Sequence, residues 1–230
     1  MSTVWPELEP LLGRVQKPAR YIGCEDGARV PDHGPGRVAW LLVYPDTYEI
    51  GLPNQGLQIL YEILNERPDA AAERSYAPWT DLEAELRANN LPLFSVDTHR
   101  DAGTFDLLAF NLSAELTYTN LLNCIDLAGV PVRAADRRAH HPLVVIGGHC
   151  AYNPEPVAAF VDLVVLGDGE ETVGDITRIV SDWKASGRGD REEPPSGAEP
   201  RGPPNLGRGG PRPAHRLTPP RRYRPPHGEQ

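Results

Sequence analysis

The stretch RVAWLLVY at residues 37–44 is an almost continuous apolar run that ends at Pro45 and Asp46. A strand that is apolar on both faces is typical of the centre of a parallel sheet, because helices cover both of its faces. Residues 54–65, NQGLQILYEILN, change to a helical period and carry their large apolar side chains on one face. The sequence therefore predicts a buried strand followed by an amphipathic helix.

The same alternation continues along the chain. Further strands are predicted at five places: a weak one at 74–77, a short one at 93–96, and longer ones at 105–111, 142–146 and 161–166. Helices are predicted at 81–89, 115–127 and 170–184. Thr80 is expected to cap the first of these helices, with Glu83 at the capping-box position, and Gly129 with Pro131 to end the second.

Repeated strand-then-helix units with short connections predict an α/β fold. We expect three layers, with a mainly parallel sheet of the flavodoxin-like type between helices and with right-handed crossovers. The domain is predicted to span residues 37–183, after a lead segment at 1–36. Residues 184–230 hold eleven prolines and eight glycines, and we expect this Pro/Arg/Gly-rich tail to be disordered.

The net charge of −9 is divided unevenly along the chain. Residues 184–230 carry ten basic and five acidic side chains, whereas the remainder carries thirteen basic and twenty-seven acidic ones. Contacts to phosphate need Lys and Arg, so the acidic body argues against nucleic acid as a partner.

The longest apolar runs are the length of a strand, far below the roughly 20 residues of a membrane-spanning helix. The N-terminus lacks the pattern of a secretory signal. Cys24, Cys124 and Cys150 are too few and too scattered for a disulfide framework. A cytoplasmic protein without a membrane partner is the expectation.

Ligands of parallel α/β sheets lie beyond the carboxyl ends of the strands. This directs attention to residues 45–51, 111–120, 147–156 and 167–172. In the first two segments the candidate side chains are polar: Asp46, Tyr48, Glu49, Ser113, Glu115, Thr117, Tyr118 and Asn120. The alternative is that they form polar turns and helix caps.

The third segment contains Gly147-Gly148, which would let a flat ligand approach the backbone, and a rigid turn that starts at Asn153. His149 and Cys150 are adjacent, so they point apart and a metal site is not favoured. In the fourth segment, Gly167 and Gly169 superficially resemble a dinucleotide fingerprint. Thr172 stands where the third glycine belongs, and two acidic residues precede it, so we reject that interpretation. Phosphate-loop and esterase motifs do not occur in the sequence.

Several segments in the right order resemble a family of radical SAM (S-adenosylmethionine) proteins. They are Pro18-Ala-Arg-Tyr-Ile-Gly23, Pro45-Asp-x-Tyr-Glu-x-Gly51, Gly56-Leu-Gln-Ile-Leu-Tyr61, Ala77-Pro-Trp79, Glu115-Leu-x-Tyr-Thr-Asn120, Gly147-Gly148, Asn153-Pro-Glu-Pro156 and Gly167-Asp-Gly-Glu170. In that family a cobalamin-binding-like domain precedes a radical SAM barrel. The resemblance covers residues 17–183 and implies a cobalamin-binding-like fold with five parallel strands.

The resemblance also implies a cofactor site. Cobalamin-binding domains carry a histidine for the lower face of the corrin in the loop after the first strand, whereas this chain has Tyr48 there. Any cobalamin is therefore expected in the histidine-off form, with Ser113 and Gly147-Gly148 near its nucleotide tail. The residues assigned to cofactor binding are Asp46, Tyr48, Glu49, Gly51, Ser113, Glu115, Tyr118, Asn120, Gly147, Gly148, Asn153, Gly167 and Gly169.

A radical SAM barrel holds its [4Fe–4S] cluster through Cys-x-x-x-Cys-x-x-Cys, and the three cysteines here lack that spacing. We therefore expect no [4Fe–4S] cluster in this chain and no catalysis by it alone. The chain is expected to be truncated before the barrel, which would normally be its partner in the same polypeptide.

Three hypotheses follow from the sequence. The first is a cobalamin-binding-like module, and the second is a scaffold of the same fold that packs against a barrel without binding the cofactor. The third is a stand-alone enzyme with Asp46, Glu49, Glu115 and His149 as acid/base groups. The third is the weakest, because no pairing of these groups is indicated.

Overall fold

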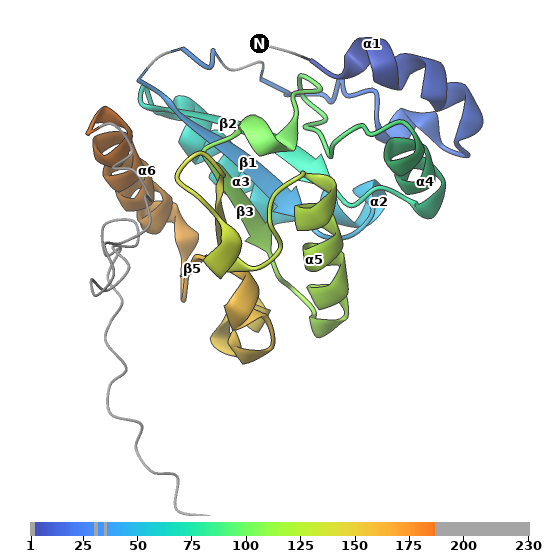
Figure 1. Ribbon diagram of the computed structural model, residues 1–230. Helices are drawn as coiled ribbons and strands as arrows, with labels where there is room; N and C mark the ends of the chain where they lie inside the picture. The colour runs from blue at the N-terminus through green and yellow to red at the C-terminus, as the bar shows by residue number, and fades with distance from the viewer. Residues whose placement is uncertain (1–2, 30–31, 35, 187–230) are drawn as a thin grey trace, which may run out of the picture.

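Strand β1 (Val38–Tyr44) lies inside a five-stranded sheet and pairs in parallel with β2 (Ala70–Tyr76) on one side and β3 (Leu107–Asn111) on the other. The computed structural model describes residues 3–29, 32–34 and 36–186. Beyond β3 follow β4 (Leu143–Gly147) and β5 (Leu163–Val164), again in parallel. The order β2-β1-β3-β4-β5 confirms the predicted parallel α/β fold of flavodoxin-like type, and Figure 1 shows the sheet among its helices.

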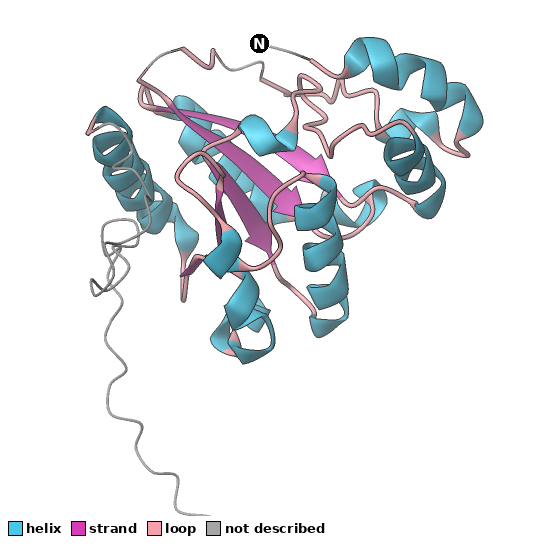
Figure 2. Cartoon of the chain, in the orientation of Figure 1, coloured by secondary structure: helices cyan, strands magenta, loops and turns pink. Residues whose placement is uncertain are grey.

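Helices cover both faces of the sheet (Figure 2). On one face α3 (Gln55–Glu66) and α6 (Gly169–Ala185) pack against alternate residues of the strands, such as Trp40 and Leu42. On the other face α5 (Tyr118–Leu127) packs against the residues between them, such as Leu41. Every residue of β1 is buried, because helices cover both faces of the sheet. This burial is the physical reason for the apolar run that predicted the strand.

The chain changes direction between β1 and β3. It first runs outward from β1 to β2, then returns across the sheet to β3 and continues to β4 and β5. The loops after β1 and β3 therefore leave the sheet toward opposite faces, and this topological switch point is where parallel sheets of this type leave room for a ligand.

Strand β2 begins four residues before its predicted start. Its first residues are Ala70, Ala71 and Ala72, which have low strand propensity, so the local signal was weak. The strand is at the edge of the sheet, and Asn65 of α3 covers part of that edge: its amide side chain bonds both the N–H and the C=O of Ala72 at 3.0 and 2.9 Å. Pairing of this kind blocks further strand addition.

The strand predicted at 93–96 is wrong. Phe94 forms only an isolated bridge with Asp101, and Val96 contacts β2 through one bond from its N–H to the carbonyl of Arg74, at 2.8 Å. The segment then turns, and the Asp97 carboxylate accepts from the N–H and the guanidinium of Arg74, each at 2.6 Å. Polar side chains thus replace the backbone ladder that a sixth strand would form.

Two other predictions differ from the structure: one concerns a helix cap, and the other concerns the length of a strand. α4 (Thr80–Ala88) starts at Thr80 and has no side-chain cap, so the predicted Thr80 capping box is wrong; Glu83 instead pairs with Arg87 at 2.9 Å. β5 covers only two of the six predicted residues; directly before it, the carboxylate of Asp162 accepts from the N–H of Val144 at 2.8 Å. α5 ends at Leu127, two residues before Gly129, as predicted.

The lead segment contains α1 (Trp5–Leu8) and two short 3-10 helices, η1 (Glu9–Arg14) and η2 (Pro18–Arg20). Figure 1 shows α1 beside α4, and residues of both pack in a third apolar cluster that includes Leu8 and Leu82. The predicted tail starts at 184, but residues 184 and 185 belong to α6; from 187 onward the tail lies outside the described residues. The lead segment is thus attached to the domain by its own small core.

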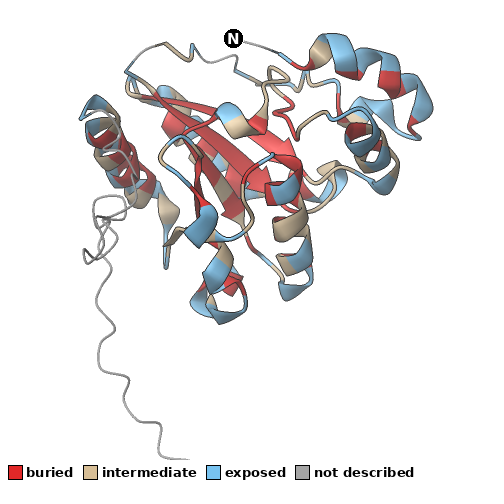
Figure 3. Cartoon of the chain, in the orientation of Figure 1, coloured by how far each residue is buried: buried red, intermediate tan, exposed pale blue. Residues whose placement is uncertain are grey.

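Burial follows the layers, with the strands almost wholly buried and the outer sides of the helices exposed (Figure 3). Within residues 3–29, 32–34 and 36–186, no helix combines the length and the apolar character that a membrane crossing requires.

We predict that Leu41→Ala lowers the free energy of unfolding by about 2–5 kcal/mol, because Leu41 is wholly buried on the central strand and the change leaves a cavity. Ile59→Ala is the matched control, since that side chain is 44% exposed on α3. Urea unfolding followed by circular dichroism measures both. Equal losses in the two variants would contradict the assignment of the core.

Candidate functional site at the carboxyl edge of the sheet

The carboxyl ends of all five strands lie at one edge of the parallel sheet, which we call the carboxyl edge. Every residue that the sequence assigned to a cofactor lies in a segment that follows β1, β3, β4 or β5. Side chains tie these segments together. Asn120 of α5 donates to the carbonyl of Pro45 at 3.0 Å, and Asn111 at the end of β3 donates to the Asn54 side chain at 3.1 Å.

The segment after β1 is held by the lead segment. It contains α2 (Tyr48–Gly51), and the Tyr48 hydroxyl donates to the carboxylate of Glu25. Burial and this bond raise the pKa of the Tyr48 hydroxyl above its ordinary value. Tyr48 also packs edge-on against Tyr76, with ring centroids 5.4 Å apart. The Tyr48 hydroxyl group is therefore used in a hydrogen bond within the protein.

Glu49 is held by two cations of the same lead segment. Its carboxylate accepts from Arg20 at 2.8 Å and from Lys17 at 3.1 Å. The hydrogen bond from Arg20 is the main cause that lowers the pKa of Glu49 to about 2. Asp46 accepts from the N–H of Thr47 at 2.7 Å, as a turn residue does. The carboxylates expected to face a ligand here instead support the loop.

Gly51 is required by packing. A methyl group on its Cα would lie 2.4 Å from Cδ1 of Tyr76 and 2.9 Å from Cβ of Tyr44, closer than atoms in proteins approach. The glycine therefore lets α2 lie directly on the ends of β1 and β2.

The two glycines at the end of β4, Gly147 and Gly148, have different roles. Gly148 has a φ of +96°, and a methyl group there would lie 2.7 Å from the carbonyl oxygen of Leu112. At Gly147 the nearest atom to such a methyl group is Cβ of Val165, at 3.9 Å. Gly148 thus permits close contact between the loops after β4 and β3, while Gly147 leaves space beside the backbone.

The segment after β3 is the most open. Ser113 donates to the Asn111 side chain at 2.8 Å and does not cap the helix, so the alternative of a helix cap does not hold for Ser113. Glu115 is exposed, and its neighbour Leu116 is 90% exposed. The hydroxyl of Tyr118 lies 3.5 Å from the carbonyls of Cys150 and Asn153, which links α5 to the loop after β4.

The segment after β5 leads into α6. A methyl group at Gly167 would meet no atom within 4 Å, whereas one at Gly169 would lie 3.2 Å from Leu60 of α3. Glu170 and Glu171 stand in the first turn of α6, where acidic side chains suit the helix dipole and disfavour a bound phosphate. Gly167 is open to a ligand, and Gly169 serves packing.

Sequence reasoning missed a set of exposed apolar side chains, one after each strand. They are Ile50 (54% exposed), Trp79 (44%), Leu116 (90%), Tyr152 (69%) and Leu166 (59%). All five follow strands that end at the carboxyl edge, and an apolar patch on a protein surface marks a site that another molecule covers. Their signal in the sequence was a large apolar residue two to six positions after the end of a strand.

Across the described parts of the chain, no three His, Cys, Asp or Glu side chains gather closely enough to hold a metal ion. His149 is exposed, and Cys150 beside it is buried in the core. Cys124 is buried as well, and Cys24 is exposed in the lead segment.

The open part of this edge suits a large, flat and partly apolar ligand. Leu116, Tyr152 and Leu166 offer apolar surface, and Gly147 and Gly167 leave space beside the backbone. Corrin rings have these properties, so the residues present fit a corrinoid that receives no ligand from the loop after β1.

A family model described as "Radical SAM proteins, N-terminal" matches residues 56–196, which is more than half of the chain. The matched range begins in α3 and includes the segments after β2, β3, β4 and β5, while the segment after β1 precedes it. A search of curated proteins found no match.

We predict that Gly148→Ala lowers the free energy of unfolding by about 1–3 kcal/mol, because it combines a positive φ with a close contact to Leu112. Gly147→Ala is expected to cost less than about 0.5 kcal/mol. Thermal and urea unfolding of both variants measure the difference. Equal costs would show that the loops do not meet at Gly148.

Glu49 should titrate near pH 2 in the folded chain, below its ordinary value of 4.5. Because folding lowers the pKa of Glu49, its charged carboxylate stabilises the folded state at pH values above 4.5. This contribution disappears as the pH falls toward 2. The carboxyl carbon shift of Glu49 in NMR spectra gives the midpoint. Arg20→Gln should raise that midpoint, and Arg14→Gln, whose partner is Glu85, should leave it unchanged. A titration midpoint of Glu49 near pH 4.5 in the wild-type chain would contradict the lowered pKa.

Proposed function

The chain belongs to the family of N-terminal regions of radical SAM proteins, and we propose that it is the corrinoid-binding module of such a protein. The carboxyl edge is the proposed binding face. The observation that carries the proposal is the exposed apolar side chain in the segment after each strand, because a water-soluble domain covers such a face with a ligand or a partner.

The part of the edge after β3, β4 and β5 is the proposed contact with the corrin. Leu116 and Tyr152 would lie against the ring, and Ser113 and Asn153 would meet its polar amide side chains. Gly147 would let the ligand approach the backbone. When bound, the corrinoid supplies a cobalt centre for group-transfer or radical chemistry.

The corrinoid is proposed to bind in the histidine-off form. Tyr48 occupies the position of the usual histidine, and its hydroxyl is bonded to Glu25. The loop after β1 therefore offers no nitrogen to cobalt. Its role is to hold the edge in shape, through Glu49 with Arg20 and through Gly51 with Tyr76.

The proposed partner is a radical SAM barrel, which would cover the other side of the ligand. The barrel of this family binds the [4Fe–4S] cluster and S-adenosylmethionine, so the reaction would take place between the two. The role of this chain would be to bind and orient the corrinoid and to exclude water from it.

A second candidate function is a scaffold that packs against the barrel without a corrinoid. Three contacts favour it: Tyr48 with Glu25, Glu49 with Arg20, and the close approach of Gly148 to Leu112. In each of them a residue expected to face the cofactor is used within the fold. A scaffold would still need the exposed apolar side chains for its partner.

Retention of hydroxocobalamin separates the two functions. The purified chain is mixed with hydroxocobalamin and desalted, and its visible spectrum is recorded. We expect retained corrinoid, with a spectrum that lacks imidazole coordination by the protein. Loss of all colour on desalting would reject the corrinoid-binding function and leave the scaffold.

Leu116→Glu tests the proposed face directly. Burial of a leucine side chain contributes about 1.5–3 kcal/mol, so its replacement by a charge should weaken corrinoid binding at least about tenfold. Ile59→Glu is the control, because it adds the same charge at an exposed position of α3. Equal weakening by both variants would place the binding face elsewhere.

A further inference from the structure

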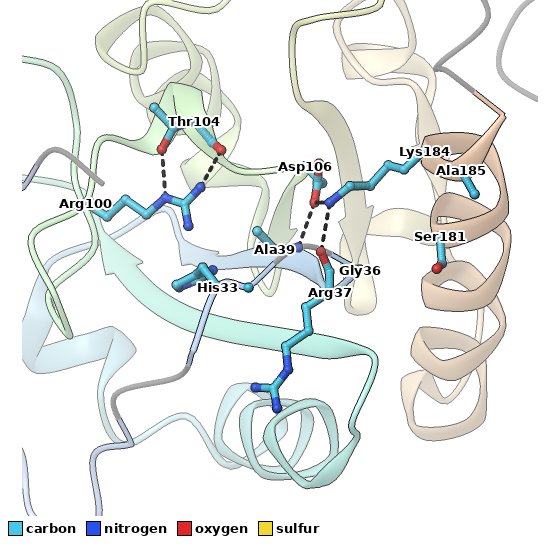
Figure 4. A pocket seen from close by; sticks show the side chains of 11 residues that line it. His33, Gly36, Arg37, Ala39, Arg100, Thr104, Asp106, Ser181, Lys184 and Ala185 are labelled. Atoms are coloured by element: carbon cyan, nitrogen blue, oxygen red, sulfur yellow. Dashed lines mark hydrogen bonds and ion pairs between the residues drawn. The ribbon is translucent and has the colours of Figure 1, made fainter.

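A pocket of about 500 Å³ lies at the opposite edge of the sheet, where β1 and β3 begin. This amino-edge pocket is lined by polar and charged residues of the lead segment, of the segment before β3 and of α6 (Figure 4). They include His33, Arg37, Arg100, Asp106, Ser181 and Lys184. Its volume is in the range of pockets that hold small molecules.

Arg100 brings a positive charge to the pocket. Its guanidinium donates to the hydroxyl and the carbonyl of Thr104, each at 2.8 Å, and stacks on Phe105 at 4.7 Å. These contacts fix the position of the charge. Burial lowers the pKa of Arg100 from its ordinary value, so an anion nearby would stabilise the charged form.

Lys184 brings a second cation from α6. Its ammonium donates to the carbonyl of Arg37 at 2.8 Å and to the carboxylate of Asp106 at 2.5 Å. An ammonium has three N–H donors, so these two contacts leave one for a ligand. Ser181, one turn earlier on α6, adds a hydroxyl to the same wall, as Figure 4 shows.

His33 lines the pocket with a side chain that is only 5% exposed. Its Nε2 is bonded to the carboxylate of Glu73, which is wholly buried. Its Nδ1 is buried and has no hydrogen-bond partner. A buried polar atom without a partner is costly, and a ligand that reached it from the pocket would remove that cost.

Glu73 orients the imidazole ring. Burial of Glu73 opposes its ionisation, but hydrogen bonds from His33, Ser95 and Thr98 outweigh burial and lower the pKa of its carboxyl group. Thr98 donates to the second carboxylate oxygen at 2.7 Å. A fixed carboxylate holds Nε2 of His33, so Nδ1 is the ring atom left for a ligand.

We propose that the amino-edge pocket binds a small molecule through a phosphate group. A tetrahedral phosphate offers several oxygens, which suits donors that come from separate elements, as Arg100, Ser181 and Lys184 do. Nδ1 of His33 donates to a phosphate oxygen when the ring is protonated and accepts from a phosphate hydroxyl when it is neutral. The site is distinct from the carboxyl edge and is independent of corrinoid binding.

Inorganic phosphate is the probe for the test. The full chain, labelled with ¹⁵N, is titrated with phosphate at constant ionic strength, and the imidazole nitrogens are followed by long-range ¹H–¹⁵N NMR spectra. We expect the His33 ring signals to shift and saturate, while those of the exposed His149 do not. Absence of a saturating His33 shift would overturn the proposal.

Two glutamate variants test where the phosphate binds. Ser181→Glu places a negative charge in the pocket wall and should weaken phosphate binding at least about tenfold, whereas Thr119→Glu adds the same charge on an exposed position of α5 and should change it less than about twofold. Equal weakening in both would show unspecific attraction and would also overturn the site. If Ser181→Glu does not fold, Ser181→Ala replaces it: a measurable loss of affinity supports the site, and unchanged affinity contradicts it.

Discussion

Asp106, directly before β3, bonds to two further strands and one helix of this fold through its main chain and its side chain together. The N–H of Asp106 donates to the carbonyl of Ala39 at 2.9 Å, and the carboxylate of Asp106 accepts from the N–H of Ala39 at 2.8 Å. Its carbonyl accepts from Leu143 at 2.9 Å, and its carboxylate also binds Lys184. One residue thus connects the beginnings of β1, β3 and β4 with the end of α6. These backbone groups would otherwise be unpaired in a buried position.

Asp162 makes the same kind of bonds two strands along, before β5. Its N–H donates to the carbonyl of Val144, and its carboxylate accepts from the N–H of Val144 and from Arg137. Both aspartates stand directly before or at the start of a strand and bond the neighbouring strand through backbone and side chain together. Beside the amino-edge pocket, buried polar bonds therefore join the amino ends of the strands, and the carboxyl edge is left to the loops.

The sequence predicted the elements whose signal is local. Residues 37–44 are apolar on both faces because α3 and α5 cover them, and this pattern predicted the central strand and the parallel sheet. β2 was cut short because its alanines carry little strand propensity, and its burial comes from neighbours distant in sequence. The segment 93–96 has strand composition, but its neighbours Asp97 and Thr98 bond to side and main chains of β2 in place of a ladder.

For the candidate site, topology was predictable and side-chain partners were not. The rule that ligands lie at the carboxyl ends of strands placed the right segments together at one edge. It could not reveal that Glu49 pairs with Arg20, since those residues are separated by a loop and by β1. The pocket with His33 was missed for the same reason: Glu73 and Lys184 meet that part of the chain only in three dimensions.

The lead segment divides the carboxyl edge into two halves. Beside β1 and β2 it bonds Tyr48 and Glu49, and Arg20 lies 5.4 Å from the ring of Trp79. Beside β3, β4 and β5 the loops bond mainly to one another and leave Leu116, Tyr152 and Leu166 exposed. A molecule that covers this edge therefore gains most apolar contact on the second half. The first half, where a histidine ligand would stand, is already occupied by the chain itself.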